Sequence, residues 1–154
     1  GLNSFITNDR QIIENSDAII LPGVGAFGEA ISNLEKLNLI GVLKHEILIT
    51  KKPLLGICLG MQLLASKGEE GGITDGLNLI SGEVKHLRDL GCKERVPHVG
   101  WNDTHIKNTS TLFLNIPSFL AKCSSPTYGC ISNTIQLNCI ASPSDIVRRS
   151  DLIL

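Results

Sequence analysis

One cysteine of the chain stands between two glycines, at the point where an apolar run gives way to a helix-like segment. The run Leu54–Ile57 predicts a short buried strand, and Cys58 and Gly60 follow it. With serine in place of cysteine, the spacing G-x-S-x-G is the nucleophile elbow of many hydrolases. Glycines beside a nucleophile permit strained backbone angles and let a substrate come close. The spacing therefore predicts a nucleophilic Cys58; the alternative is a small buried side chain, the usual role of a free cysteine.

The residues after Cys58 predict surroundings that suit negative charge. Residues 61–65 are predicted as a helix, and a helix begins with unpaired N–H groups at the positive end of its dipole. Those groups would stabilise a thiolate on Cys58. They also place the Leu59 amide near the oxyanion that forms when the sulfur attacks a carbonyl carbon.

A second glycine-rich stretch leaves two interpretations open. Gly23, Gly25 and Gly28 follow the apolar residues 18–21, a predicted strand, and their spacing is that of G-x-G-x-x-G. After a strand, this pattern is typical of a loop whose N–H groups bind a phosphate. A dinucleotide site also requires an acidic residue at the end of the next strand, and here that strand ends in Cys58. The spacing therefore favours some other negative charge over a nucleotide.

The composition of the 154 residues narrows the class of protein. With 42% hydrophobic and 19% charged residues, the chain has the make-up of one folded domain. A net charge of -1 provides no basic surface for nucleic acid, and no apolar run approaches the roughly eighteen residues of a membrane span. Five cysteines without a C-x-x-C pair indicate neither disulfides nor zinc. We therefore expect a cytoplasmic protein with no metal, cofactor, nucleic-acid or membrane partner.

Two strands, each followed by helical residues, must position these groups. Helical spacing runs from residue 29 to residue 39 and continues through Ile40, Leu43 and Ile47 until Pro53. The order strand, helix, strand, helix predicts parallel pairing and the α/β class. Further along, Glu69 and Glu70 are interpreted as a solvated loop. Strands are predicted within residues 77–84 and from Ile131 to Cys139.

Three motifs, taken together, resemble one family. They are LPGVGAFGEAI at residues 21–31, PLLGICLGMQLL at 53–64 and RVPHVGWN at 95–102. In these motifs and their order the chain is similar to the class I (triad) glutamine amidotransferases, and among them to the glutaminase subunit of imidazole glycerol phosphate synthase.

The resemblance covers about residues 7 to 119 and implies a fold. It is a flavodoxin-like three-layer sandwich with a mostly parallel sheet, from which edge elements are missing here. Residues 1–119 would form the amidotransferase-like domain, with an incomplete N-terminus, and residues 120–154, which contain neither Glu nor His, a divergent tail.

The resemblance also implies a role for each motif. Cys58 attacks the side-chain carboxamide of glutamine, forms a thioester and releases ammonia. The glycine loop serves the oxyanion and not a phosphate, with the Val24 or Gly25 amide acting beside Leu59. The implied substrate-binding residues are Gly23, Gly25 and Gln62, with a solvated helix position as the alternative for Gln62. The implied contacts with a partner, a cyclase of the (β/α)8-barrel type, are Pro97, His98, Trp101 and Asn102, with core packing as the alternative for Trp101.

The chain departs from the family at the general base. The family carries an H-x-E pair downstream of residue 102, whereas none of the four histidines, His45, His86, His98 and His105, has Glu two positions later. Ammonia is a poor leaving group and needs a proton from such a histidine. Little or no glutaminase activity is therefore predicted for the chain as written. Two alternatives to a subunit for histidine biosynthesis are a paralogue that serves surface-sugar amidation and a non-catalytic remnant that binds the cyclase.

Overall fold

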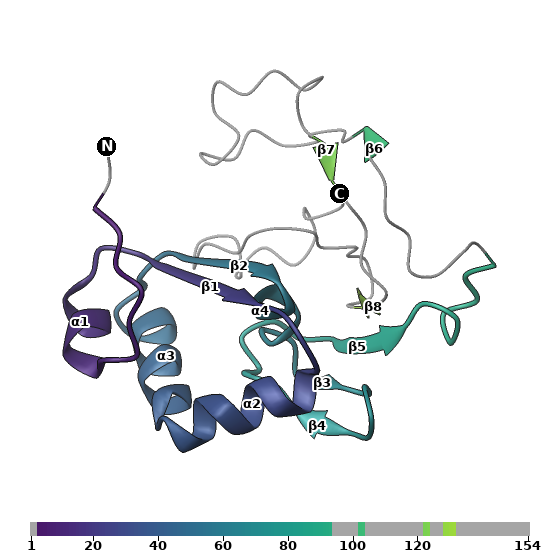
Figure 1. Ribbon diagram of the computed structural model, residues 1–154, viewed down its shortest axis with the longest axis horizontal. Coiled ribbons are helices and arrows are strands. Elements are labelled where there is room, and N and C mark those ends of the chain that lie inside the picture. Colours follow the sequence, from purple (N-terminus) through teal and green to yellow (C-terminus); the bar gives the residue numbers. More distant parts are fainter. Residues whose placement is uncertain (1–2, 94–101, 104–121, 124–127, 132–154) are drawn as a thin grey trace.

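The computed structural model describes residues 3–93 and three short strands further along the chain (Figure 1). Helices and strands alternate through the first part, which confirms the predicted α/β class. The elements are α1 (Arg10–Asn15), β1 (Ile19–Gly23), α2 (Phe27–Lys36), α3 (Leu39–Leu48), β2 (Leu54–Cys58), α4 (Leu59–Gln62), β3 (Lys67–Gly68), β4 (Thr74–Asp75) and β5 (Glu83–His86). The later strands are β6 (Asn102–Asp103), β7 (Lys122–Cys123) and β8 (Tyr128–Ile131).

Strands β1 and β2 form a parallel pair that brings the two glycine-rich motifs together. The register runs from Ile19 opposite Leu54 to Gly23 opposite Cys58. The connection between the strands contains α2 and α3, as expected for a parallel crossover. Because parallel strands end at the same edge of a sheet, the loop after Gly23 and the turn after Cys58 leave the pair side by side.

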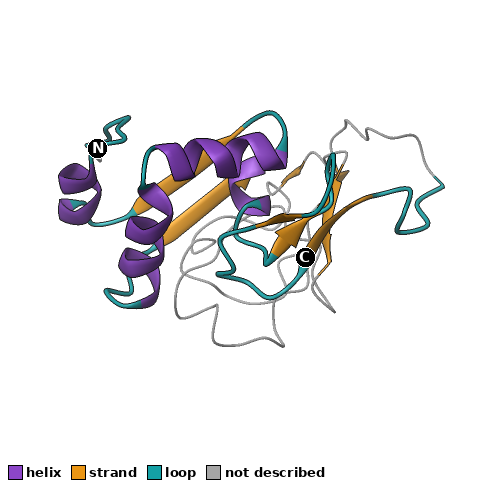
Figure 2. Cartoon of the chain, turned by 90° about the horizontal axis from the view of Figure 1, so that it is seen from below, coloured by secondary structure: helices purple, strands orange, loops and turns teal. Residues whose placement is uncertain are grey.

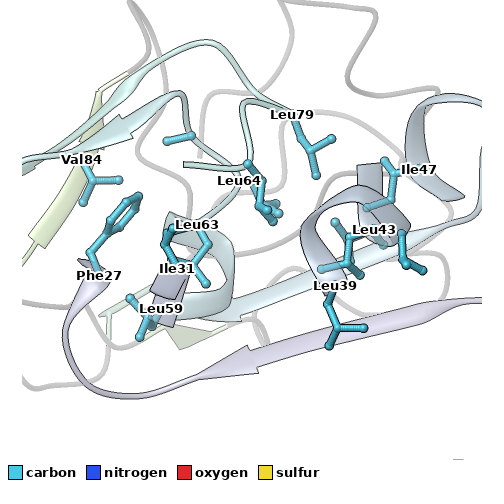
Figure 3. Packing of buried hydrophobic residues seen from close by; sticks show 14 of the residues in the cluster. Phe27, Ile31, Leu39, Leu43, Ile47, Leu59, Leu63, Leu64, Leu79 and Val84 are labelled. Carbon is cyan, nitrogen blue, oxygen red and sulfur yellow. The ribbon is translucent and has the colours of Figure 1, made fainter. Parts of the chain in front are cut away.

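The two central helices share an apolar core with the segment that follows β2. Phe27 and Ile31 of α2 and Ile47 of α3 are at most 4% exposed. Figure 3 shows Phe27 and Ile31 on the side of Leu59 and Leu63, Ile47 near Leu43, and Leu64 between these two groups. Burying a side chain of this size stabilises a fold by about 1.5–3 kcal/mol. In Figure 2 the helices are grouped with the parallel pair, and further strands lie beyond them.

The helical region predicted after the first strand is interrupted. Helix α2 ends at Lys36, before the predicted end at residue 39, and α3 begins at Leu39. Asn38 between them has a φ of 56°, in the left-handed region that asparagine tolerates better than most residues. The apolar spacing runs through this break, so periodicity alone could not locate it.

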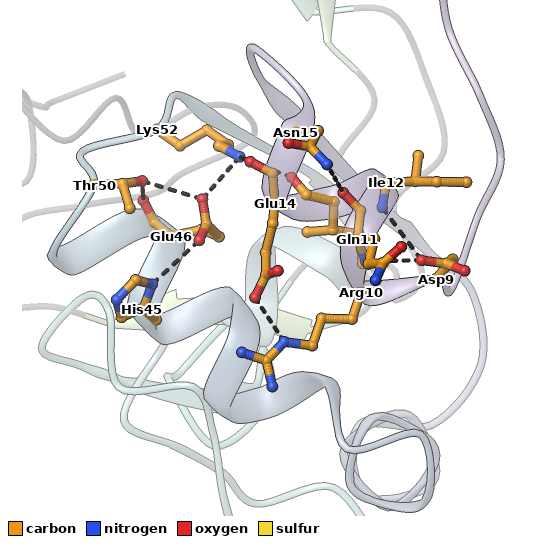
Figure 4. Close-up of polar contacts among 11 residues, drawn as sticks. Asp9, Arg10, Gln11, Ile12, Glu14, Asn15, His45, Glu46, Thr50 and Lys52 are labelled. Atoms are coloured by element: carbon orange, nitrogen blue, oxygen red, sulfur yellow. Dashed lines mark hydrogen bonds and ion pairs between the residues drawn. The ribbon is translucent and has the colours of Figure 1, made fainter.

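Helix α1 is an element that the sequence patterns did not predict. Asp9 caps it, because its Oδ1 accepts hydrogen bonds from the amides of Gln11 at 2.7 Å and Ile12 at 3.3 Å. At the other end, the Lys52 ammonium donates to the carbonyl oxygens of Ile13 at 2.7 Å and Glu14 at 2.8 Å (Figure 4). One side chain from a distant loop therefore donates to carbonyls at the helix end, in addition to the bonds that Ser16 makes with the Ile13 carbonyl.

Lys52 also forms a buried ion pair with Glu46 of α3, at 2.8 Å between Nζ and Oε2. Hydrogen bonds from Lys52 and then His45 hold the pKa of Glu46 below its ordinary value of 4.5, and Thr50 adds a further one. This cluster precedes β2 in the chain, and Cys58 is the last residue of β2. Because a strand rises about 3.3 Å per residue, β2 from Leu54 to Cys58 separates the cluster from the cysteine by roughly 13 Å.

A second, mixed sheet has the strand order β4-β3-β5-β8, in which β3 and β5 are parallel and the outer pairs antiparallel. The sequence predicts strands within residues 77–84. Of these residues, only Glu83 and Val84 lie in a strand, at the start of β5. Ile131 ends β8, and residues 132–139 of that predicted strand lie outside the described residues. No helix in the described ranges is long and apolar enough to cross a bilayer.

Candidate active site

Cys58 occupies a sharp turn between β2 and α4 and is exposed to solvent. Its backbone angles are φ 54° and ψ -119°, a conformation that side-chain-bearing residues rarely adopt. Such a residue costs about 1–3 kcal/mol and is held in place by its surroundings. The predicted elbow is therefore present in the fold. The alternative, in which Cys58 is a small buried side chain, is wrong because Cys58 is exposed.

The two flanking glycines are required by backbone crossings. A Cβ added at Gly60 would lie 1.8 Å from the Leu21 carbonyl oxygen of β1, and one added at Gly56 would lie 2.7 Å from the Met61 Cα. Neither neighbour is a flexible side-chain tip, so no larger residue fits without moving the strand or the turn. The spacing G-x-C-x-G thus allows β1 to press against the turn that carries Cys58.

The glycine loop after β1 lies beside the same turn. A Cβ at Gly23 would approach the Gly60 nitrogen to 3.0 Å and the Leu59 Cβ to 3.1 Å. Val24 is 91% exposed, and Gly25 has a φ of +102°, which glycine adopts without strain. The structure thus brings Gly23 and the loop that begins with Val24 and Gly25 to the edge where Cys58 and Leu59 lie.

Helix α4 runs from Leu59 to Gln62, so it begins before the predicted helix at residues 61–65 and also ends before it. The carbonyl groups that would continue it accept amides from a later segment: Leu77 donates to Leu63 at 2.8 Å and Leu79 to Leu64 at 2.9 Å. A single turn has little macrodipole, so negative charge at Cys58 would be met by the first amides of the turn themselves, which lack intrahelical partners.

Gln62 is 5% exposed and ends α4. The alternative of a solvated helix position for this residue is therefore wrong. Burial of an amide side chain requires hydrogen-bond partners, which is compatible with a structural or a substrate-binding role.

Glu70 is a residue that sequence reasoning missed. It was interpreted with Glu69 as a solvated loop, but its Oε2 accepts a hydrogen bond from the Phe27 amide at 2.9 Å. Glu69 forms an ion pair with Lys85 at 3.1 Å. Both carboxylates are therefore engaged with other elements. The Phe27 contact spans 43 residues of sequence, so no local pattern could have indicated it.

Other predicted residues fall outside this geometry. Pro97, His98 and Trp101 lie outside the described residues, and Asn102 is in β6, opposite Cys123 of β7. Among the described residues, no group of three or more His, Cys, Asp or Glu side chains is arranged to hold a metal ion.

Comparison with known proteins places these motifs in one family. The model of the family "Glutamine amidotransferase class-I" matches residues 3–138. The imidazole glycerol phosphate synthase subunit HisH 1 of Campylobacter jejuni (strain 81-176) is 43% identical over 133 residues, with 80% of this chain and 65% of that protein covered. The HisH 2 subunit of Vibrio vulnificus is 46% identical over 109 residues (71% and 50%), and HisH of Aquifex aeolicus is 47% identical over 107 residues (70% and 50%).

The chain spans between half and just under two thirds of the length of these relatives. The matched range includes the glycine loop and the cysteine turn, and it extends to residue 138. The domain boundary near residue 119 stays a prediction. With the family model matching most of its length, the chain belongs to the class-I glutamine amidotransferases.

Proposed function

We propose that the chain carries the cysteine of a glutamine amidotransferase that releases ammonia from glutamine. The Cys58 thiol gives up its proton and its sulfur attacks the side-chain carboxamide carbon. A C–S bond forms, the C–N bond breaks, and the leaving nitrogen takes up the proton and departs as ammonia, which leaves a glutamyl thioester. Water then attacks the thioester and glutamate departs. The observation that supports this most is the exposed Cys58 on a strained turn, with the glycine loop beside it.

The neighbouring residues would serve the oxyanion and the substrate. The Leu59 amide, together with that of Val24 or Gly25, would donate hydrogen bonds to the oxyanion of the tetrahedral intermediate. Gly23 and Gly25 would bind the substrate through their backbone groups; a side chain at Gly23 would crowd Leu59 and Gly60, and one at Gly25 would be strained by the positive φ. Gln62 would hold the amino-acid end of glutamine.

Labelling of Cys58 tests this proposal. A diazo ketone analogue of glutamine should alkylate Cys58 in the full 154-residue chain, and excess glutamine should slow the reaction. Intact mass and peptide mapping measure it, with the other four cysteines as internal controls and Cys58→Ser as the blank. Labelling that spreads over several cysteines and ignores glutamine would contradict the proposal.

The absence of an H-x-E pair from these 154 residues limits turnover. Loss of one triad member costs roughly 10⁴ to 10⁶-fold in rate in well-studied hydrolases. We expect the chain alone to release ammonia from glutamine at background, as measured in a steady-state coupled assay. Turnover within a hundredfold of that of a full-length relative would overturn this prediction.

The acceptor of the ammonia is proposed from the names of the relatives, which are imidazole glycerol phosphate synthase subunits. A cyclase subunit of the (β/α)8-barrel type would receive it, with residues 97–102 at the interface, in a cytoplasmic pathway of histidine biosynthesis. Co-purification of the chain with such a cyclase tests the partner separately from the chemistry. Binding without any labelling of Cys58 would favour the non-catalytic remnant.

A further inference from the structure

The helix that follows the glycine loop receives its cap from far along the chain. Helix α2 begins at Phe27, and Ala26 before it has no side chain that could accept a hydrogen bond from the first turn. Instead, the Glu70 carboxylate accepts the Phe27 amide at 2.9 Å. A carboxylate at this end of a helix also interacts favourably with the helix dipole.

Packing contacts from the segment around Glu70 also hold the first turn of α2. A Cβ at Gly68 would lie 2.7 Å from the ring of Phe27, which is 1% exposed, so the ring is packed directly on the β3 backbone. A Cβ at Gly28 would lie 3.3 Å from the Thr74 hydroxyl of β4. Figure 1 shows β3 and β4 beside the end of α2 that follows β1.

The same segment is fixed to the mixed sheet on its other side. The Glu69 amide donates to the Val84 carbonyl at 3.0 Å, and the Glu69 carboxylate pairs with Lys85 at 3.1 Å. Lys85 also pairs with Glu83 at 3.0 Å, and Glu83 pairs with Lys67 at 2.9 Å. Backbone and ionic contacts with β5 therefore fix the segment from which the Glu70 side chain extends.

The glycine loop lies between two anchors as a result. Gly23 ends β1 and is paired with β2, while Phe27 is held through Glu70. Only Val24, Gly25 and Ala26 lie between them. Because Gly25 has no Cβ, its backbone can adopt a wide range of angles. Loss of the Glu70 contact would leave the Phe27 amide without its acceptor and loosen this end of the loop, while the Phe27 ring stayed packed on β3 and the cysteine turn stayed on β2.

We propose that Glu70 is a positioning residue, which sets the glycine loop against Cys58 by capping α2. This rests on the proposed function, in which the loop amides serve the oxyanion. Glu70 acts here through the Phe27 amide and needs no contact with substrate.

The test compares variants of the full chain. Glu70→Ala removes the acceptor, Glu70→Asp shortens it, and Glu70→Gln keeps an acceptor oxygen without the charge. Glu69→Ala is the matched control, since it removes the adjacent carboxylate, which contacts Lys85 and not α2. Two quantities are measured: amide hydrogen exchange of residues 24–28, and the labelling rate of Cys58 by the diazo ketone analogue relative to a small alkylating reagent.

For Glu70→Ala and Glu70→Asp we expect exchange at residues 24–28 to rise about tenfold, the size of a lost helix cap. The relative labelling rate should fall by a similar factor, and Glu70→Gln and Glu69→Ala should stay within about threefold of the parent chain. Unchanged exchange in Glu70→Ala and Glu70→Asp overturns the proposal, as does faster exchange with unchanged relative labelling.

Slower labelling without faster exchange also overturns the proposal, because it means that Glu70 acts on the substrate directly. If the parent chain is not labelled at all, the proposed function fails. The exchange measurement then still decides whether Glu70 holds the loop.

Discussion

At Cys58 the chain keeps a strained backbone conformation because two neighbouring strands press on the turn. Gly60 lies against the Leu21 carbonyl and Gly56 against Met61, so close packing of backbone on backbone sets the path of the chain. The exposed sulfur follows from that path. The glycines are thus explained by sterics within the fold, in addition to any space that they leave for a substrate.

Gly60→Ala should destabilise the chain by roughly 3 kcal/mol or more, because its Cβ would overlap the backbone of β1. Gly41→Ala is the control, since a Cβ there meets nothing within 4 Å in the exposed face of α3. That change should stabilise by about 0.5–1 kcal/mol, the ordinary preference of a helix for alanine. Urea denaturation measures both; equal effects would show that the crossing at Gly60 is not tight.

Among the elements, α1 depends on a residue that is distant in sequence. Lys52 binds two carbonyls at the end of α1 and the carboxylate of Glu46; the contacts with Ile13 and Glu46 are buried, and the contact with Glu14 is partly buried. The six residues of α1 are too few for an isolated helix to be stable, so tertiary contacts must hold it. This is why its existence could not be predicted from local spacing, although Asp9 is a recognisable cap.

Lys52→Ala should destabilise the chain by about 3–5 kcal/mol, because the buried Glu46 carboxylate would lose its ion-pair partner and keep only its contacts with His45 and Thr50. Lys51→Ala, the exposed neighbour, should change the free energy of unfolding by no more than about 0.5 kcal/mol. Denaturant titrations followed by far-UV circular dichroism compare the two. A similar small effect for both lysines would contradict the role given to the buried pair.

Glu46 should also make stability depend on pH. Its pKa lies below the ordinary 4.5, chiefly because of the hydrogen bond from Lys52. A carboxyl group whose pKa is lowered by folding stabilises the fold above its unfolded pKa, and the contribution is lost as pH falls through the folded value. Unfolding midpoints measured from pH 7 to pH 3 should therefore decline below about pH 4.5, and less steeply in Glu46→Gln. Identical profiles in the two chains would exclude Glu46 as a source of the pH dependence of stability.

Across the described part of the chain, the core covers one face of the β1–β2 pair and leaves the other face partly exposed. Ile19 and Leu21 of β1 pack against the core, whereas Ile20 on the opposite face is 60% exposed and Ile57 of β2 is 41% exposed. Apolar side chains exposed together on one sheet face favour association. Ile20→Thr should therefore reduce light scattering at high protein concentration. Ile73→Thr, at a 74% exposed position outside the β1–β2 pair, is the control and should have less effect.

Sequence patterns were sufficient for the strand and turn at Cys58, because apolar spacing and glycine placement act within a few residues. They were insufficient wherever two distant segments decide the outcome. Glu70 reaches Phe27 across 43 residues and Lys52 reaches Ile13 across 39, and neither contact has a local signature. The predicted helix at residues 61–65 was misplaced: α4 runs from Leu59 to Gln62, and the Leu64 and Ala65 amides donate to carbonyls three residues earlier, as in a 3₁₀ turn.

The short α4 has a consequence for how the cysteine turn is assembled. The Leu63 and Leu64 carbonyls can either continue the helix or receive the amides of Leu77 and Leu79, but a continued helix would withdraw them from those amides. Lengthening of α4 and docking of the later segment are therefore competing outcomes. The point at which α4 ends is therefore decided by a segment about fifteen residues further along the chain, and not only by the residues of the turn itself.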